Sequence, residues 1–441
     1  MEERTSSWNA VTEYAPSAEW GFSPLDEELA LLPGSLTPRL QEDLTHLATW
    51  MPFEKARNML KRLRGVEVSE ATVRRCTESH GAAYVAWQEA EVERIEQELP
   101  EAPAGPDKQL LSVDGAMVPL VGGEWAEVKT LVLGVIEEPV IEGGEQKVHA
   151  RELSYFSRLL PAERFTRLAL VETQQRGVEN AGKVIAVVDG AEWEQGFIDY
   201  HRADAVRILD FPHAAEYVGK IGSAVWGEAT PATQQWLTQQ LHCLKHQGPA
   251  QVLAELRTLV AAHPEKPDLA GCLAYLEKRE AQMQYPTCQE QGWPLGSGAV
   301  ESGNKLVVEA RLKGSGMHWA RAQVNPMLGL RNAVCSDRWD EAWGQISDQQ
   351  TQQAQKRRQI RRAQHLAAYS PASADHSRLP LLAASPQPNA VEAALAPAVE
   401  TVEVTAQSQQ PWRPPPDHPW RRRPACTPSR WSRSRSADAK K

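Results

Sequence analysis

The sequence predicts an α/β fold with a central sheet, because strand-like and helical segments alternate over residues 106–340. Three apolar, β-branched segments come first, and Gly122-Gly123 marks the turn between the first two. Two shorter apolar segments follow, each succeeded by helical sequence. The five expected strands are 109–120, 127–138, 148–159, 183–190 and 205–211.

The expected helices complete a recognisable order. One begins at Pro161 and runs to about Arg176, a second ends near Tyr200, and a third follows Pro212. The order is β-β-β-α-β-α-β-α, in which three meandering strands precede two α/β crossovers. This is the element order of the RNase H fold, so we expect residues 106–340 to form an RNase-H-like domain.

Residues 36–100 have a helical pattern and predict a separate all-α domain. Gly65 lies in a short turn, and Ser69 suits the N-cap of a helix that presents Arg74 and Arg75. A helix, a short glycine-containing turn and a second helix form the pattern of a helix-turn-helix, which reads DNA in the major groove. A small packing domain with solvated arginines is the alternative. The expected helices are 37–50, 52–64, 69–80 and 83–99.

Composition argues against several classes of protein. The 441 residues include six scattered cysteines without a Cys-x-x-Cys pair, which disfavours a zinc site or a disulfide framework. No apolar stretch approaches the roughly 20 residues of a membrane span. The N-terminus lacks the pattern of an export signal. We therefore expect a cytoplasmic protein with no membrane partner.

The net charge of −9 is unusual for a DNA-binding protein, but the charge is unevenly distributed. Segments 355–362 and 419–441 are strongly basic, and binding depends on the local field rather than on the average. Residues 1–35 have the composition of a flexible linker. Residues 345–441 form a low-complexity basic tail, expected to be largely disordered apart from one helix near 341–368.

Two aspartates interrupt or end predicted core strands. Asp114 lies within LLSVDGAMV, and Asp189 ends the buried strand VIAVVDG. Either one alone could simply form a turn with the glycine that follows. In an RNase-H-like sheet, however, the first and fourth strands are neighbours, so the two carboxylates would face each other. Such a pair repels unless a cation lies between them, and oxygen ligands favour Mg²⁺ or Mn²⁺.

Glu301 is the third candidate acid, within GSGAVESGNKLVVEARLKGSGMHW at 296–319. Ser297 suits an N-cap, which would place Glu301 in the first turn of a helix. The basic residues that follow suit a helix presenting a metal ligand toward a DNA phosphodiester. An amphipathic helix with Glu301 near its positive end is the other interpretation. The basic residues are Lys305, Arg311, Lys313 and His318.

Four blocks of the chain resemble, in order, a bacterial insertion-sequence transposase. They are SVDGAMVPLVGGEWAEVKTLVLG, VIAVVDGAEW, RILDFPHAAEYV and GSGAVESGNKLVVEARLKGSGMHW. Over about residues 20–345 the chain is similar to the Kra-four insertion-sequence family, within the Mutator-like group of DDE transposases. The basic segment around HPWRR (418–422) resembles the family as well.

The resemblance implies that Asp114, Asp189 and Glu301 are the catalytic, metal-binding acids. They would hold two Mg²⁺ or Mn²⁺ ions, with Asp114 bridging both, for DNA cleavage and 3′-OH strand transfer. Asp210 and His213, from the motif Asp-Phe-Pro-His, would form a supporting pair close to the site. Asp210 is the weaker candidate for the second acid, because the family's second acid precedes this motif.

The resemblance also implies a helical insertion at about 222–294, before the third acid. A tryptophan of the insertion would lie near the DNA end: Trp236 is the candidate, Trp226 is the alternative, and a core role is equally open. The expected partner is DNA, as terminal inverted repeats and target, bound by a homodimer or a higher synaptic complex. Such a protein would associate with the nucleoid.

Two further functions stay open at this stage. An RNase-H-like nuclease that cuts without joining would share every catalytic residue. An inactive or domesticated transposase would bind DNA with acids that no longer hold metal. The sequence does not distinguish copying of the element from its excision.

Overall fold

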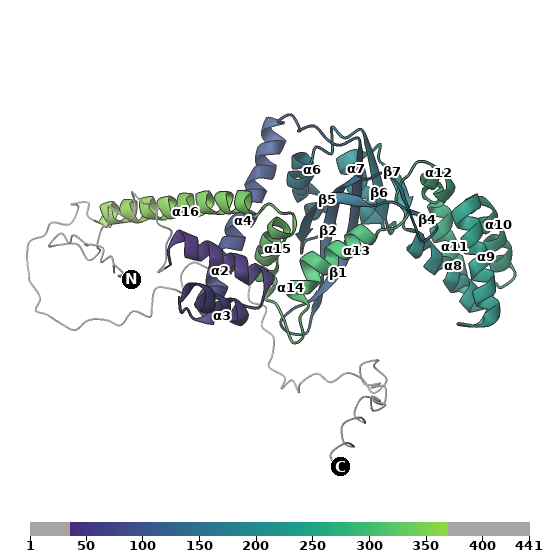
Figure 1. Ribbon diagram of the computed structural model, residues 1–441, viewed down its shortest axis with the longest axis horizontal. Coiled ribbons are helices and arrows are strands. Elements are labelled where there is room, and N and C mark those ends of the chain that lie inside the picture. The colour runs from purple at the N-terminus through teal and green to yellow at the C-terminus, as the bar shows by residue number, and fades with distance from the viewer. Residues whose placement is uncertain (1–35, 369–441) are drawn as a thin grey trace, which may run out of the picture. The chain divides into compact units, whose positions relative to one another are not determined.

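A computed structural model describes residues 36–368, drawn in colour in Figure 1. The predicted linker at 1–35 and most of the predicted low-complexity tail, 369–441, lie outside the described residues. Within the described range, no helix combines the length and apolar character that a membrane span requires.

The centre of the chain is a mixed five-stranded sheet, which agrees with the predicted α/β class. Its order is β5-β2-β1-β6-β7, so that β1 lies in the middle. The first three strands pair antiparallel, and β6 and β7 join parallel to β1 and to each other. The strands are β1 Lys108–Pro119, β2 Trp125–Ile136, β5 Ala150–Arg158, β6 Lys183–Val188 and β7 Val206–Leu209.

One pair of short strands was not predicted from the sequence pattern. Between β2 and β5 the chain forms a separate small hairpin, β3 (Val140–Glu142) and β4 (Glu145–Lys147). Gly143 and Gly144 form its turn with positive φ angles, which glycine adopts without steric cost. β3 has three residues, all exposed, and its sequence Val-Ile-Glu shows no alternation of apolar and polar residues that would predict a strand.

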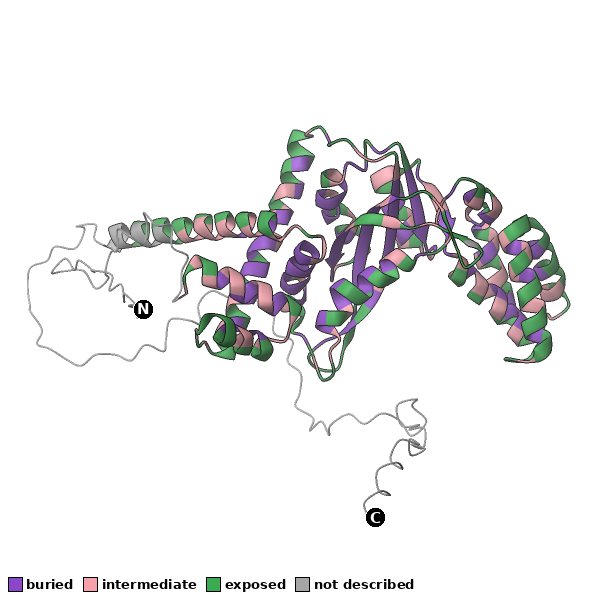
Figure 2. Cartoon of the chain, in the orientation of Figure 1, coloured by how far each residue is buried: buried purple, intermediate pink, exposed green. Residues whose placement is uncertain are grey.

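Successive residues of β1 face opposite sides of the sheet, and apolar residues on both sides pack against helices (Figure 2). Leu111 and Val113 pack with helices α4 to α7. Val118 packs with the C-terminal helices α13 Gly298–Gly303, α14 Ala310–Leu312 and α15 Arg321–Cys335. The helices α5 Ala162–Leu168 and α6 Leu170–Gln175 follow the antiparallel strand β5. The helices α7 Glu192–Arg202 and α8 Phe211–Trp226 follow the parallel strands β6 and β7.

The segment between β7 and Leu295 is helical, as expected for the predicted insertion. Its apolar residues form one cluster with β6 and β7, among them Leu256, Leu276 and Tyr285. After α8 its elements are α9 Pro231–Gln247, α10 Pro249–Ala261, α11 Pro267–Lys278, η1 Glu280–Gln282 and α12 Tyr285–Glu290.

The N-terminal helices are α2 (Pro38–Trp50), α3 (Phe53–Arg64) and α4 (Glu70–Glu98). Ser69 caps α4 as predicted, since its hydroxyl accepts from the Thr72 backbone N–H at 3.1 Å. The expected break near residues 81–82 is absent, and α4 is one continuous helix. Gly81 does not end the helix. It lets α4 approach α15 (Arg321–Cys335), where an added Cβ would lie 2.6 Å from the Pro326 carbonyl carbon.

Candidate active site

Asp114 lies in the middle of β1, where it is half-buried and pairs with Thr130 of β2. Its carboxylate accepts two hydrogen bonds: from the Gly115 backbone N–H at 2.6 Å and from Asn304 Nδ2 at 2.9 Å. Burial raises the pKa of Asp114, and these two hydrogen bonds partly oppose the rise. Glu301 and Glu127 raise it further through charge repulsion.

Asp189 directly follows β6, the strand that pairs in parallel with β1. In that register Leu111 is opposite Ala186, so three residues further along each strand Asp114 and Asp189 reach the same level. The predicted neighbourhood of the two strands is therefore present. Burial raises the pKa of Asp189 to about 6, although His213 opposes the rise, and Asp114, Asp210 and Glu301 add to it.

Glu301 is exposed in the first turn of α13 (Gly298–Gly303), the helix expected there. The Ser297 side chain makes no capping hydrogen bond, in contrast to the expectation. Gly303 lets the helix lie close to the sheet: a Cβ there would come within 2.9 Å of Val132 and 3.0 Å of Tyr155. Glu301 raises the pKa values of both Asp114 and Asp189 through charge repulsion.

Asp210 directly follows β7, and His213 lies in the first turn of α8. One oxygen of Asp210 accepts from the His213 backbone N–H at 2.8 Å and so caps α8. Its other oxygen accepts from the Ser297 backbone N–H at 2.6 Å. Buried Asp210 thus fixes the chain just before the helix of Glu301. His213 Nδ1 is 3.9 Å from an Asp189 oxygen.

Four residues at the site were missed by the sequence reading. Asn304 contacts Asp114, and Tyr275 and Arg279 contact the backbone after β6. Glu194 is only 2% exposed, and its carboxylate accepts from the Ala191 backbone N–H at 2.9 Å. Burial raises the pKa of Glu194 to about 8, and Asp189 adds to the rise. Its place in the first turn of α7 was the one signal, since a glutamate there often caps the helix.

As they stand in the described residues, the three acids do not form a complete metal-binding site. Among residues 36–368, no group of three or more His, Cys, Asp and Glu side chains is close enough to hold a metal ion. In donor chemistry the set fits a divalent cation, because carboxylate oxygens are preferred ligands of Mg²⁺ and Mn²⁺. Glu301 also raises the pKa of both Asp114 and Asp189 through charge repulsion. Shared binding of one ion would require their side chains to turn toward each other.

The basic residues after Glu301 differ in their surroundings. Lys305 and His318 are exposed, whereas Lys313 pairs with Glu309 at 2.6 Å. Arg311 requires a correction, because we expected it to contact DNA. It is 2% exposed, and its Nε donates to the Ala48 carbonyl oxygen at 3.0 Å. The rings of Phe53 and Trp319 enclose the guanidinium, so Arg311 joins the N-terminal helices to the sheet domain.

The two tryptophans of the insertion lie against each other, with ring centroids 5.0 Å apart. Trp236 packs over Gly222, where an added Cβ would meet its ring at 2.7 Å. Trp226 is 38% exposed. The packing of Trp236 against α8 favours a core role, and Trp226 is the more accessible of the pair.

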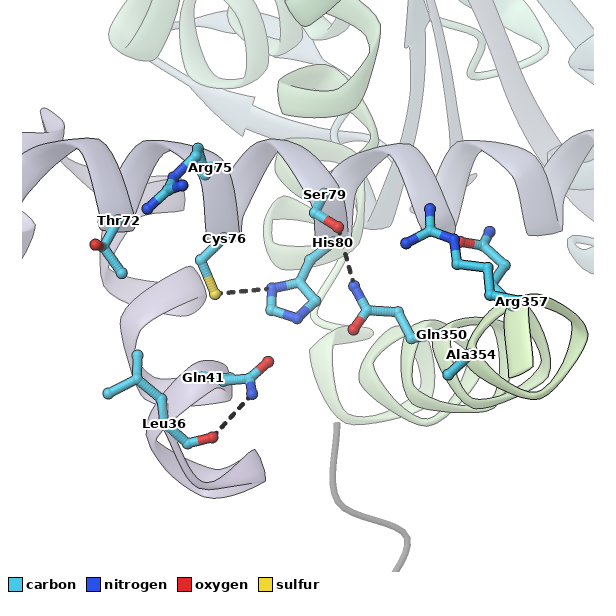
Figure 3. A pocket seen from close by; sticks show the side chains of 11 residues that line it. Leu36, Gln41, Thr72, Arg75, Cys76, Ser79, His80, Gln350, Ala354 and Arg357 are labelled. Carbon is cyan, nitrogen blue, oxygen red and sulfur yellow. Dashed lines mark hydrogen bonds between the residues drawn. The ribbon is translucent and has the colours of Figure 1, made fainter. Parts of the chain in front are cut away.

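Arg74 and Arg75 are exposed near the start of α4. Arg75 lines a hollow of about 410 Å³ formed by α2, α4 and α16 (Trp339–Ala368), shown in Figure 3. Arg357 of α16 lines the same hollow, and Gln350 bridges the two helices by donating to Ser79 Oγ at 3.4 Å. The predicted helix near 341–368 is present as α16 and lies beside the predicted DNA-reading helix.

No protein-family model and no curated protein matches the sequence of the chain. Its function must therefore be inferred from the residues and geometry of the site.

Proposed function

We propose that the chain is a DNA transposase of the DDE class whose catalytic domain has an RNase-H-like fold. The observation that carries the proposal is that Asp114 and Asp189 reach the same level on the neighbouring strands β1 and β6, while Glu301 raises the pKa of both. The three residues come from distant parts of the sequence. The strand order also supports it. With the strands of the main sheet numbered along the chain, the order is third, second, first, fourth, fifth, which is the RNase H arrangement.

The proposed reaction is metal-dependent cleavage of DNA followed by transfer of a 3′-hydroxyl. Mg²⁺ or Mn²⁺ would supply charge stabilisation and an activated oxygen nucleophile, which suits the attack of water or a DNA hydroxyl on a phosphodiester. Asp114 lies within the strand β1, and Asp189 directly follows the strand β6. Glu301 is exposed on a short helix, so it can adjust its position as DNA enters.

Recognition of DNA is assigned to the N-terminal helices. Helices α3 and α4, joined at Gly65 with its positive φ, support a helix-turn-helix with Arg74 and Arg75 on the reading helix. Lys305 and His318 are exposed and offer further positive or hydrogen-bonding contacts to DNA. Strand transfer needs two element ends together, so we include assembly as a dimer or larger complex in the proposal.

The test uses the full-length protein, Mn²⁺ or Mg²⁺, and labelled DNA from both flanks of its gene. The wild type should nick the DNA and join the 3′ ends to a target. Asp114→Asn and Glu301→Gln should lose about a thousandfold or more of the rate, since each removes a metal ligand worth several kcal/mol. Glu309→Gln is the matched control, because Glu309 lies on the same helical segment and pairs with Lys313.

The outcomes separate the open alternatives. Nicking without joining would indicate a nuclease that shares the acids. Binding without metal-dependent cutting would indicate an inactive or domesticated DNA-binding protein. Equal rates for wild type and Asp114→Asn would remove Asp114 from the site.

A further inference from the structure

Asp189, the proposed second acid, begins the turn Asp189-Gly190-Ala191, which leads from β6 to α7. Gly190 has φ +82°, a left-handed conformation that most side chains avoid. An added Cβ would also lie 2.7 Å from Arg279 Cδ. A glycine turn is intrinsically free to move, so the direction of the Asp189 side chain depends on what holds the backbone of this turn.

The helical insertion holds the two carbonyl groups of the turn. The hydroxyl of Tyr275, on α11, donates to the Asp189 carbonyl oxygen. Arg279, just after α11, donates to the Gly190 carbonyl oxygen through both Nε, at 2.8 Å, and Nη2. The two residues also support each other: Arg279 Nη1 donates to the Tyr275 carbonyl oxygen at 3.0 Å, and its guanidinium lies 3.8 Å above the Tyr275 ring.

Glu194 holds the other side of the turn. Its carboxylate accepts from the Ala191 backbone N–H at 2.9 Å. Both carbonyl groups of the turn and the Ala191 N–H therefore have partners within the protein. Of these partners, Tyr275 and Arg279 come from the insertion and lie 86 and 89 positions away along the chain.

The burial of Arg279 is costly for stability alone. The residue is 6% exposed, and removing a cation from water costs several kcal/mol unless close partners compensate. The nearest carboxylate is exposed Glu192 at 3.6 Å, which also pairs with Lys278. An apolar side chain would pack this position at less cost. A planar donor that binds one carbonyl through two N–H groups is suited instead to fixing an orientation.

We propose that Tyr275 and Arg279 are positioning residues for Asp189, through which the helical insertion determines how well the second acid binds a divalent cation. The inference rests on the proposed function, since it assigns Asp189 to a metal site. It extends that function by giving the insertion a part in forming the site, in addition to any contact with DNA.

Mn²⁺ binding to the full-length protein without DNA tests the inference, with free Mn²⁺ measured by electron paramagnetic resonance. Arg279→Met should bind Mn²⁺ about tenfold more weakly, because loss of a group that orients a metal ligand typically costs ten- to a hundredfold in affinity. Arg279→Lys keeps the charge and one donor and should recover part of the loss. Tyr275→Phe removes only the hydroxyl and provides a test should Arg279→Met fail to fold.

Arg257→Met is the matched control. Arg257 pairs with Glu277 at 2.6 Å on the same helices of the insertion, with its side chain 51% exposed. It should bind Mn²⁺ as the wild type does. If Arg257→Met weakens binding as much as Arg279→Met, general loosening of the insertion is the cause and the inference fails.

Two further results distinguish this inference from the proposed function. If Asp189→Asn loses Mn²⁺ while Arg279→Met and Tyr275→Phe both keep wild-type affinity, the positioning role is overturned and the metal site stands. If the wild type binds no more Mn²⁺ than Asp189→Asn, both the proposed function and the inference are overturned.

Discussion

Asn304 Nδ2 lies 2.9 Å from Asp114 Oδ2, a hydrogen bond between residues 190 positions apart. Asn304 begins the π-helix η2 (Asn304–Glu309), directly after the helix of Glu301. Single π-helical turns often occur at functional sites, because the wider turn redirects the side chains around it. The amide thus connects the strand of the first acid to the helix of the third.

Replacing Asn304 tests whether this contact stabilises the site. Asn304→Ala leaves a half-buried carboxylate oxygen without its donor, so we expect the free energy of unfolding to fall by about 1–3 kcal/mol. The hydrogen bond lowers the pKa of Asp114, so the variant should also need a higher pH to bind Mn²⁺. Urea unfolding and Mn²⁺ titration at several pH values measure both effects. Asn58→Ala, at an exposed position, is the control, and equal unfolding midpoints would contradict the prediction.

Glu194 should make stability depend on pH. Its pKa in the folded protein is about 8, above the ordinary value of 4.5, so the native state binds the proton more tightly than the unfolded chain does. The stabilisation from this group is complete below about pH 4.5 and is lost as the pH rises through about 8. The loss is at most about 5 kcal/mol, since each pH unit corresponds to about 1.4 kcal/mol.

Glu194→Gln removes the titrating group while keeping an oxygen that can accept from the Ala191 N–H. The difference in unfolding free energy between the variant and the wild type should therefore increase with pH between 4.5 and 8, in favour of the variant. Urea midpoints at pH 5, 6, 7 and 8 measure it. A difference that stays constant over this range would show that Glu194 does not titrate there.

Arg75 should contribute to DNA binding through phosphate contact. For Arg75→Ala we expect weaker affinity for any duplex. The slope of log K against log salt concentration should become smaller in magnitude by about one. Fluorescence anisotropy with a labelled duplex at several salt concentrations provides the measurement. Arg94, further along α4, is held by Glu91 and Glu98, so Arg94→Ala should leave the slope unchanged. A slope for Arg75→Ala equal to that of the wild type would remove Arg75 from the DNA interface.

Arg311 should behave as a structural residue. Arg311→Met removes the donor to the Ala48 carbonyl oxygen and the cation between two aromatic rings, which should cost about 2–4 kcal/mol of unfolding free energy. The salt dependence of DNA binding should not change. A reduced slope with unchanged stability would restore the original expectation that Arg311 contacts DNA.

Local patterns were sufficient to predict the five strands of the main sheet, and they singled out Asp114 and Asp189 as candidate acids. An apolar, β-branched segment such as VIAVV forms a buried strand in almost any α/β context, and a carboxylate at its end is noticeable in the sequence alone. The hydroxyl of Ser69 at the start of α4 is an equally local signal, because it bonds to a backbone N–H three residues away.

The sequence by itself determined the α/β class and the five strands of the main sheet, since these depend on residues close together in the chain. The assignment of Asp114, Asp189 and Glu301 as catalytic acids came from the resemblance and stays a prediction. The tertiary structure alone decided three other features: that Arg311 is buried, that Gly81 lies inside a continuous α4, and that Tyr275 and Arg279 hold the turn of Asp189. Each depends on contact between residues far apart in the sequence, here up to 263 positions for Arg311 and Ala48. An arginine looks the same in the sequence whether it faces solvent or a distant carbonyl group, so only the packing of the helices distinguishes the two.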